Sequence, residues 1–525
     1  MNKRIFKDFA MKKLPIGLNS LEKIIKGNYV YVDKTDKILE LIEGGSYYFL
    51  SRPRRFGKTL TVDTLKNIFE GNKEIFEGLY IHDKWNWDKR YPVIRIDFST
   101  GEIDNTQKLY KVIFSLLEEH AKRYGLAISK DEPGLALREM VLNLYETQRE
   151  RVVILIDEYD KPILDNITKP EVAEKIRDSL ADFYGVLKGL DEYLKFVFLT
   201  GVTKFSKVNL FSKLNNLEDI TLDPRYSTLC GYTDEELERY FSEYLKNVDR
   251  EQVKLWYNGY SWLGEKVYNP FDILLFISKG FQFRPYWFET GTPTFLMKLL
   301  KKEKYYIPNL DTVEASDELL SSFDVYTMEI ESLLWQTGYL TITGTKMLGI
   351  KQIYKLSYPN LEVKISLNER ILRFLSGINQ PSYTRTLNIV YQGLVEGNVD
   401  KIISGLKTLF SSISYTNFTK NEIASYEGYY ASVIYTYFHS LGVQPIAEDV
   451  TSRGRIDLTI KIEDKVYIFE FKVIEEEKDN KNPLEQIKEK KYFEKHKNEA
   501  NEIYLIGISF SKEERNITSY SWEKI

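Results

Sequence analysis

The sequence predicts an α/β multidomain protein, in which a parallel sheet wrapped by helices precedes a helical middle region and a smaller α/β domain. The chain has 525 residues, which at roughly 100–200 residues per domain indicates about three domains. Short apolar strands alternate with amphipathic helices from about residue 46 to 201, a pattern typical of a parallel sheet. A helix, a hairpin, a second helix and a strand follow residue 421, and this order indicates a separate compact unit.

The first domain is expected to contain four strands and four long helices. VVILI in the third strand is apolar at every position, as expected of a strand that is buried on both faces. The strands are expected at 46–51, 93–99, 152–158 and 196–201. The helices are expected at 58–71, 105–126, 134–149 and 170–189.

The middle region has fewer strand signals. Thr233 is a helix N-cap signal, and the residues after it repeat apolar side chains at helical spacing. A later segment, ESLLWQTGYLTITGTKMLGIKQIYKLSYPN, predicts a helix, a turn and a hairpin, an order that suits a winged-helix unit. We therefore expect three domains, over residues 1–232, 233–375 and 376–525, of which the middle one is helical and winged-helix-like.

Composition excludes several classes of protein. The net charge is −4, so the chain is not a polybasic nucleic-acid coat. The single cysteine excludes a disulfide framework. The four histidines lie far apart in the sequence, which argues against a His-based metal site. No apolar run reaches the roughly 18 residues of a membrane helix, and the basic start lacks the apolar region of a signal peptide. We expect no membrane partner and a cytoplasmic location.

Residues 51–60, SRPRRFGKTL, lie between a predicted strand and a predicted helix. Gly57, Lys58 and Thr59 match the end of a phosphate-binding loop, which needs a lysine for the terminal phosphates and a hydroxyl for Mg²⁺. Arg52 replaces the first glycine of that pattern, so a basic turn is the alternative interpretation. The residues expected to bind the nucleotide are Arg54, Arg55, Phe56, Gly57, Lys58 and Thr59.

A pair of acids follows the most apolar strand. Asp157 and Glu158 are placed at its C-terminal end, where open α/β sheets bind ligands. Asp157 is expected to hold Mg²⁺ together with Thr59, and Glu158 to orient or deprotonate the attacking water. Such a pair also caps strands without any function, but its place about 100 residues after the loop favours an ATPase fold. Thr200 or Thr203, at the next strand end, is a candidate sensor of the terminal phosphate.

The predicted C-terminal hairpin carries a second set of acids. If Glu463 and Asp464 form a two-residue turn, Asp457 pairs directly with Glu470, and Lys472 lies beside them. Facing carboxylates repel one another unless a divalent cation lies between them. This trio suits metal-dependent phosphodiester hydrolysis. The alternative is an exposed polar face with a single salt bridge.

Two flanking segments offer auxiliary residues for this hairpin. Glu427 begins an aromatic-rich helix just before it and could add a metal ligand. Gln486 and Tyr492 lie in the helical segment that follows it.

Longer motifs extend along nearly the whole chain from Leu14 onward. They are LPIG, YVDKT, RPRRFGKT, LIDEYDKPI, LTGVTKFS, YNGY, VYNPFDIL, YWFETGTPTFL, WQTGYLTI, YPNLEV, YEGYYASVIYTYF, GRIDL and FEFKV. In these motifs the chain resembles a family of prokaryotic proteins that join an AAA-ATPase-like domain to a PD-(D/E)XK-type nuclease domain. The family also lacks the first glycine of the phosphate loop, and Ile456 stands where the nuclease motif has proline.

The resemblance implies a P-loop NTPase of the ASCE/AAA-like type and a restriction-endonuclease-like domain. It implies Lys58 and Thr59 for nucleotide and Mg²⁺, and Asp157 and Glu158 for metal and water. In the nuclease-like domain it implies a catalytic core with two auxiliary residues. The core is Asp457, Glu470 and Lys472, and the auxiliary residues are Glu427 and Gln486.

We therefore predict an ATP-dependent nuclease in which ATP binding controls a metal-dependent phosphodiester cut. The expected cofactors are ATP and Mg²⁺, with Mn²⁺ as an alternative at the nuclease-like site. The expected partner is nucleic acid, with DNA favoured over RNA, and homo-oligomer formation is left open. The alternatives are a nucleotide-dependent switch or a DNA-binding mobile-element or defence protein that does not cut, and an ATP-driven remodeller.

Overall fold

The chain folds into two compact units. Unit 1 lies within Met1–Thr290 and Thr312–Leu361, and unit 2 within Gly291–Asp311 and Glu362–Ile525. The three-part division expected from the sequence remains a prediction beside these two units. The computed structural model describes residues 11–205, 216–290, 294–321, 326, 328–413, 427–474, 482–511 and 513–525.

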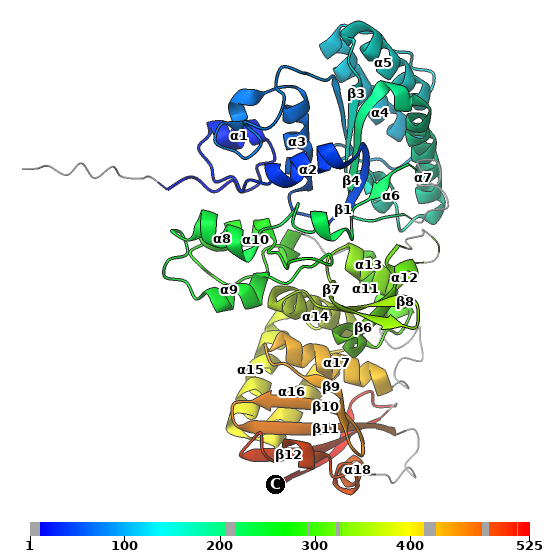
Figure 1. The fold of residues 1–525 in the computed structure, drawn as a ribbon. Coiled ribbons are helices and arrows are strands. Elements are labelled where there is room, and N and C mark those ends of the chain that lie inside the picture. Colours follow the sequence, from blue (N-terminus) through cyan, green and yellow to red (C-terminus); the bar gives the residue numbers. More distant parts are fainter. Residues whose placement is uncertain are drawn as a thin grey trace, which may run out of the picture. The chain divides into compact units, whose positions relative to one another are not determined.

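Unit 1 contains a five-stranded sheet in the order β2-β3-β4-β1-β5, and every neighbouring pair is parallel (Figure 1). This confirms the predicted α/β class. All residues of β3 are buried. β4 lies between the loop-bearing β1 and the acid-bearing β3, whereas β2 lies beyond β3. The strands are β1 (Tyr47–Ser51), β2 (Val93–Asp97), β3 (Val152–Asp157), β4 (Leu194–Gly201) and β5 (Glu218–Asp219).

The four predicted long helices of this domain are confirmed, with ends that local sequence explains. The Asn105 side chain caps one of them, α4, which ends at Gly125 in the left-handed conformation. These helices are α3 (Lys58–Phe69), α4 (Thr106–Tyr124), α5 (Pro133–Gln148) and α7 (Pro170–Gly185). The shorter helices are α1 (Leu21–Lys26), α2 (Thr35–Gly44) and α6 (Lys161–Leu164).

The rest of unit 1 contains short helices and a three-stranded antiparallel sheet, β6-β8-β7. Thr233 caps the start of α8, as the sequence predicted, and the Glu236 side chain completes a reciprocal capping box with it. The predicted order of helix, turn and hairpin is also confirmed, while the winged-helix assignment remains a prediction. The elements are α8 (Asp234–Phe241), α9 (Arg250–Tyr257), α10 (Pro270–Ser278), β6 (Val313–Ser316), α12 (Asp317–Ser321), α13 (Ile330–Gln336), β7 (Thr341–Leu348) and β8 (Lys351–Ser357).

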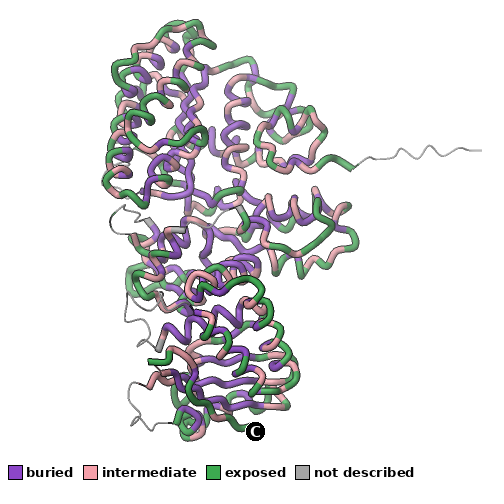
Figure 2. Tube along the Cα trace, turned by 180° about the vertical axis from the view of Figure 1, so that it is seen from behind, coloured by how far each residue is buried: buried purple, intermediate pink, exposed green. Residues whose placement is uncertain are grey.

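Unit 2 contains a mixed sheet in the order β13-β12-β11-β10-β9, in which β11 and β12 are parallel. α17 and α18 both contact its strands. The strands β11 and β12 are mostly buried, whereas the edge strand β13 is mostly exposed (Figure 2). The sequence predicted β10, β11 and β12 but missed the edge strands β9 and β13. The elements are α11 (Thr294–Lys302), α14 (Leu361–Ser376), α15 (Gln380–Glu396), α16 (Val399–Ser411), α17 (Glu427–Ser440), β9 (Ile446–Thr451), β10 (Gly454–Ile462), β11 (Lys465–Ile474), α18 (Pro483–Glu489), β12 (Glu502–Ser511) and β13 (Ile517–Lys524).

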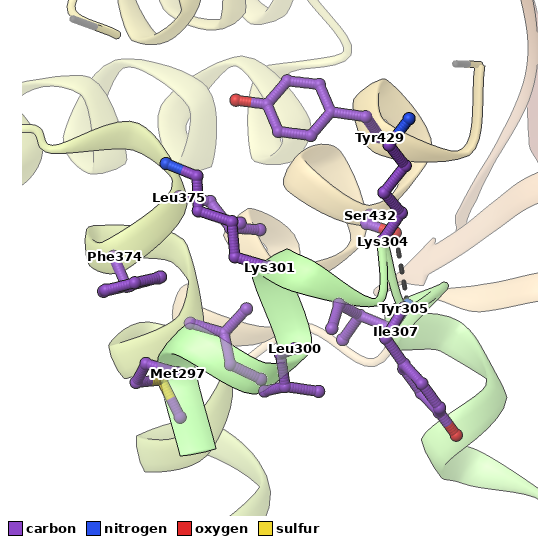
Figure 3. Close-up of a pocket in the computed structure, with 11 residues that line it drawn as sticks. Met297, Leu300, Lys301, Lys304, Tyr305, Ile307, Phe374, Leu375, Tyr429 and Ser432 are labelled. Atoms are coloured by element: carbon purple, nitrogen blue, oxygen red, sulfur yellow. Dashed lines mark hydrogen bonds between the residues drawn. The ribbon is translucent and has the colours of Figure 1, made fainter. Parts of the chain in front are cut away.

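Unit 2 begins in the sequence with a separate segment, Gly291–Asp311, which precedes the last part of unit 1. Its Ile307 N–H donates to Ser432 Oγ on α17 at 3.2 Å, a bond that Figure 3 marks as a dashed line. Its Asp311 pairs with Lys364 at 2.8 Å and accepts from the Tyr435 hydroxyl. A cavity of about 30 Å³ lies beside this segment, lined mainly by apolar side chains such as Met297, and is too small for a nucleotide. The segment is therefore part of the core of unit 2.

Among the described residues, none of the helices is both long enough and apolar enough to cross a bilayer.

A buried histidine gives unit 2 a predictable pH dependence. Burial lowers the pKa of His439 on α17 to about 2, with a smaller contribution from Lys364. Below a pH of about 6.5 the unfolded chain takes up a proton at this site that the folded chain does not. The free energy of unfolding should therefore be undiminished above pH 6.5 and fall below it, by about 1 kcal/mol between pH 7.5 and 5.5.

His439→Phe should remove this part of the acid sensitivity, as measured by urea unfolding of the full chain at the two pH values. Phe438→Leu, at a buried apolar position of the same helix, is the control and should keep the wild-type pH dependence. Equal pH dependence in all three proteins would contradict the assignment.

Candidate active sites

The phosphate loop joins β1 to α3 through a glycine in an unusual conformation. Gly57 has a φ of +100° and directly precedes the first residue of α3, so a side chain at this position would be strained. This conformation turns the chain into the helix and leaves the first N–H groups of α3 facing outward. Helix N-termini of this kind bind phosphate.

The loop lysine lies against the loop itself. Lys58 is 3% exposed, and its ammonium group donates to the carbonyl oxygens of Arg52 at 3.0 Å and Pro53 at 3.2 Å. Its Nζ is also 3.7 Å from Glu158 Oε1. The structure therefore brings together the loop lysine and the acid that follows β3, as the sequence predicted for one site.

Arg52, which replaces the first glycine, is buried and faces away from the phosphate position. Its guanidinium donates to the carbonyl oxygens of Ser51 at 2.8 Å, Thr221 at 2.9 Å and Tyr226 at 3.2 Å. It also lies 4.2 Å from the centre of the Trp262 ring. Burial lowers the pKa of Arg52 to about 10, so it stays charged at neutral pH. Arg52 has a structural role in the loop.

Asp157 is placed to bind a cation. Its side chain is buried, and neither carboxylate oxygen has a hydrogen-bond partner among the described residues. Burial, followed by the charges of Glu158 and Asp97, raises the pKa of Asp157 to about 6. A buried carboxylate is costly unless charges or hydrogen bonds compensate it, and the Thr59 hydroxyl and Arg95, 3.9 Å away, do so only in part. The donor set of Asp157 and the Thr59 hydroxyl therefore fits Mg²⁺.

Two residues of β2, which the sequence reasoning missed, lie beside Asp157. Asp97 pairs with Asp157 in the parallel register of β2 and β3. Arg95 approaches three acids, with distances of 3.3 Å to Asp63, 3.4 Å to Asp97 and 3.9 Å to Asp157. Arg95 therefore supplies positive charge to this acidic end of the sheet. The strand VIRIDFS itself carried the signal, because its polar residues alternate along an otherwise apolar strand.

A cavity of about 460 Å³ opens above the loop, within the size range of small-molecule sites. Arg54 and Arg55 are exposed and line it with Lys58, Thr59 and Glu158. Its remaining wall comes from segments to which the sequence analysis assigned no role, although LPIG, YVDKT and VYNPFDIL lie there. These wall residues include Pro15, Gly17, Leu18, Asn19, Ile24, Val30, Tyr31, Val32, Asp97, Tyr232, Pro270, Phe271 and Leu274.

Not every residue expected at the nucleotide site lines this cavity with its side chain. Phe56 is 1% exposed and packs edge-on against Tyr260 and Trp262. Its side chain therefore belongs to the core, and only its backbone is available to a ligand. Of the two sensor candidates, Thr203 donates its hydroxyl to Asp160 at 2.7 Å, whereas the buried Thr200 hydroxyl has no partner among the described residues.

The hairpin of unit 2 has the predicted two-residue turn, since Ile462 pairs with Lys465. The pairing of β10 with β11 runs as far as Leu458 and Phe469, and the direct pairing of Asp457 with Glu470 remains a prediction. The Phe471 N–H donates to Asp457 Oδ2 at 2.7 Å. Glu470 is 4% exposed, so the face that carries it is covered. The alternative of an exposed polar face is therefore wrong for β11.

A close approach of helix to sheet brings Gln486 onto this hairpin. Glu470 pairs with Gly507 of β12, and a methyl group at Gly507 would lie only 2.4 Å from the Leu484 backbone nitrogen on α18. The absence of a side chain thus lets α18 lie against the strand. The Gln486 amide then donates to Glu470 Oε1, while its auxiliary role remains a prediction.

Three other residues predicted for this site lie on β11, after α18 and at the start of α17. Lys472 is half-buried and lies two residues after Glu470 on β11, so both side chains project from the same face. Tyr492 lies in a short 3₁₀ turn after α18, and its pKa is raised by burial and then by the charge of Glu470. Glu427 is the first residue of α17, but its side chain lies outside the described residues.

The described residues contain no cluster of three or more metal-binding side chains. A divalent cation at Asp457 and Glu470 would therefore complete its shell with water, backbone or substrate oxygens, as Mg²⁺ commonly does.

The two sites define a class of protein, the nuclease-associated ATPases. Two protein-family models match the chain: one described as predicted AAA-ATPase over residues 15–211, and one described as PD-(D/E)XK nuclease superfamily over residues 425–520. A protein of Azotobacter chroococcum mcd 1, described as an uncharacterized protein in the vnfD 5′ region, is 46% identical over 518 residues, which are 98% of this chain and 100% of that protein. The chain belongs to the family of predicted AAA-ATPases that carry a C-terminal domain of the PD-(D/E)XK nuclease superfamily.

Restoring the usual glycine of the phosphate loop should damage the protein. Arg52→Gly removes three charged hydrogen bonds from a buried site, so it should lower the free energy of unfolding by at least about 3 kcal/mol. Arg54→Gly, two residues away at an exposed position, should cost about 1 kcal/mol or less. Thermal and urea unfolding would measure both changes. Equal stability of the two variants would show that the Arg52 contacts contribute little.

Proposed function

We propose that the chain binds and hydrolyses ATP in unit 1 and that this controls metal-dependent phosphodiester cleavage in unit 2. The observation that carries the ATP assignment is the 460 Å³ cavity that gathers Lys58, Thr59 and Glu158 at the end of a parallel sheet. Cationic, hydroxyl and acidic groups then face one space, as phosphoryl transfer requires.

The cavity has a polar side and an apolar side. The triphosphate lies along the N-terminus of α3, where Arg54 and Arg55 contact it and Lys58 moves from the loop carbonyl oxygens to the terminal phosphates. The base lies against apolar wall residues such as Val30, Phe271 and Leu274. Asp157 and Thr59 hold Mg²⁺, which neutralises charge on the phosphates. Glu158 orients and deprotonates the attacking water.

In unit 2 the proposed chemistry is cleavage of a nucleic acid, with DNA as the favoured polymer. Asp457 and Glu470 hold the divalent cation, Mg²⁺ or Mn²⁺, which polarises the phosphate. Lys472 stabilises the charge that develops on the phosphate oxygens. Gln486 orients the Glu470 carboxylate through its hydrogen bond.

Contacts between the phosphate loop and the chain that leads toward unit 2 support the control relationship. The Trp287 indole donates to the Arg54 carbonyl oxygen at 3.1 Å, and Trp287 lies four residues before unit 2 begins at Gly291. A methyl group at Gly338 would lie 2.7 Å from Pro53 Cβ. A change in the loop on ATP binding therefore acts on segments that lead directly to the second unit.

A nucleotide-dependent switch that does not cut is the second candidate. The hydrogen bonds from the Phe471 N–H and the Gln486 amide already engage the acids of the hairpin. If the protein is such a switch, these hydrogen bonds stabilise a surface that binds nucleic acid without cutting it. The role of the ATP site is then the same as in the first proposal.

Glu158→Gln should retain ATP binding and lose hydrolysis by at least about 100-fold, because the amide cannot accept the proton of the water. Isothermal titration with ATP and a phosphate-release assay would measure the two properties. Glu43→Gln, at an exposed acid of α2, is the control and should leave both unchanged. Hydrolysis at the wild-type rate in Glu158→Gln would remove Glu158 from the mechanism.

Asp457→Asn should abolish metal-dependent cleavage, with a loss of at least about 100-fold, because it removes a charged ligand of the cation. Plasmid DNA, single-stranded DNA and RNA would be tested with Mg²⁺ or Mn²⁺, with and without ATP. Asp464→Asn, in the turn of the same hairpin, should cut normally. If ATP-binding wild-type protein cuts none of the substrates, the switch is favoured and the nuclease proposal fails.

A further inference from the structure

The β7–β8 hairpin of unit 1 ends in an exposed apolar tip. Met347, Leu348 and Ile350 are 63%, 66% and 96% exposed. The third strand, β6, pairs with β8 only as far as the Ser316–Ile353 pair, so the tip extends past the sheet (Figure 1). Large apolar side chains gathered at such a position indicate a binding surface.

The charge on the hairpin itself is of one sign, while Glu314 of β6 lies opposite Lys355. The hairpin residues Thr341 to Ser357 contain three lysines and no acid, although the whole chain has a net charge of −4. Lys351 and Lys355 are exposed. Lys346 pairs with Glu314 of β6 at 2.5 Å, with side chains 40% and 54% exposed, so this pair is weak in water and a phosphate can replace it.

We propose that this hairpin inserts its tip into a groove of duplex DNA, with the lysines on phosphates and the apolar side chains against base pairs. The proposal rests on the proposed function, in which the chain acts on nucleic acid, and it names the element that reads the polymer. A two-stranded ribbon fits the major groove of B-DNA. Leucine, isoleucine and methionine also serve as wedges between base steps in the minor groove.

Other partners match the tip less well. The deep, narrow major groove of duplex RNA does not admit such a ribbon. Lysine is depleted in protein–protein interfaces, and here lysines flank the apolar residues on both strands. Duplex DNA supplies the negative charge and the apolar base surfaces together.

The root of the hairpin contacts the nucleotide site. Gly338, three residues before β7, has a φ of +90° and packs against Pro53 of the phosphate loop. Gln336, at the end of α13, accepts from the Lys204 N–H just beyond β4 at 3.0 Å. ATP binding is therefore expected to change the DNA affinity of the tip.

The test is the equilibrium affinity of the full chain for a fluorescent 25-base-pair DNA duplex, measured by anisotropy at several salt concentrations with Mg²⁺ and ATP. Asp457→Asn is present throughout, so that no DNA is cut. Leu348→Ser with Ile350→Ser should weaken binding about 10-fold and leave the salt dependence unchanged. Lys346→Gln with Lys351→Gln should weaken binding and reduce the slope of log affinity against log salt by about 2.

The matched control is Leu255→Ser with Lys279→Gln, an exposed leucine and an exposed lysine elsewhere in unit 1, and it should bind like the parent. Wild-type DNA affinity in both hairpin variants, or no DNA binding by the parent, would overturn the proposal. An equal loss of affinity for duplex RNA would also overturn it, because the groove argument excludes RNA. The proposal would also be overturned if the hairpin variants kept their DNA affinity and lost only self-association, measured by sedimentation, because the tip would then join copies of the chain.

The two proposals fail in different ways. Hairpin-dependent DNA binding by a wild-type protein that never cuts would support this inference and remove the nuclease activity. Cleavage that depends on Asp457, in a protein whose DNA affinity is unchanged by the hairpin variants, would support the nuclease activity and overturn this inference.

Discussion

The buried guanidinium of Arg52 is the interaction on which the nucleotide site depends. It ties the end of β1 to carbonyl oxygens at Thr221 and Tyr226 and stacks on the Trp262 ring. The carbonyl oxygen of Arg52 in turn accepts a hydrogen bond from the ammonium group of Lys58. A loop that usually relies on glycine for its close turn is here fixed by a cation that three carbonyl oxygens surround. The shape of the loop therefore depends on residues that follow the last strand of the sheet.

The same loop also contacts the middle of the chain, through Pro53 at Gly338 and Arg54 at Trp287. These are packing and backbone contacts, so they respond to the position of the loop and not to side-chain charge. Coupling between sites requires an element with two arrangements that both sites favour differently. In the proposed function the loop is the candidate element, because Lys58 is held by the carbonyl oxygens of Arg52 and Pro53 and would have to leave them to reach a phosphate.

Sequence patterns predicted what local periodicity determines. The strands of the first sheet and the two-residue turn at Glu463 could be derived because burial and register leave few alternatives. Long-range contacts could not be derived. Arg52 and Arg54 are equally basic in the sequence, yet one is buried structure and the other lines the cavity. The cavity wall near Val30 likewise needed the three-dimensional fold, since it unites segments that are about 240 residues apart.

Unit 2 is built from two separate stretches of the chain, and this sets the order in which its parts are synthesised. Its first segment, Gly291–Asp311, leaves the ribosome before the helices that it packs on, α14 and α17, which are complete at Ser376 and Ser440. At 5–20 residues per second the delay before α17 is complete is roughly 6–26 seconds. Until then the apolar side of α11, including Leu296 and Leu300, lacks part of the contacts that bury it in the folded chain. The core of unit 2 is therefore assembled from segments that are synthesised at separate times.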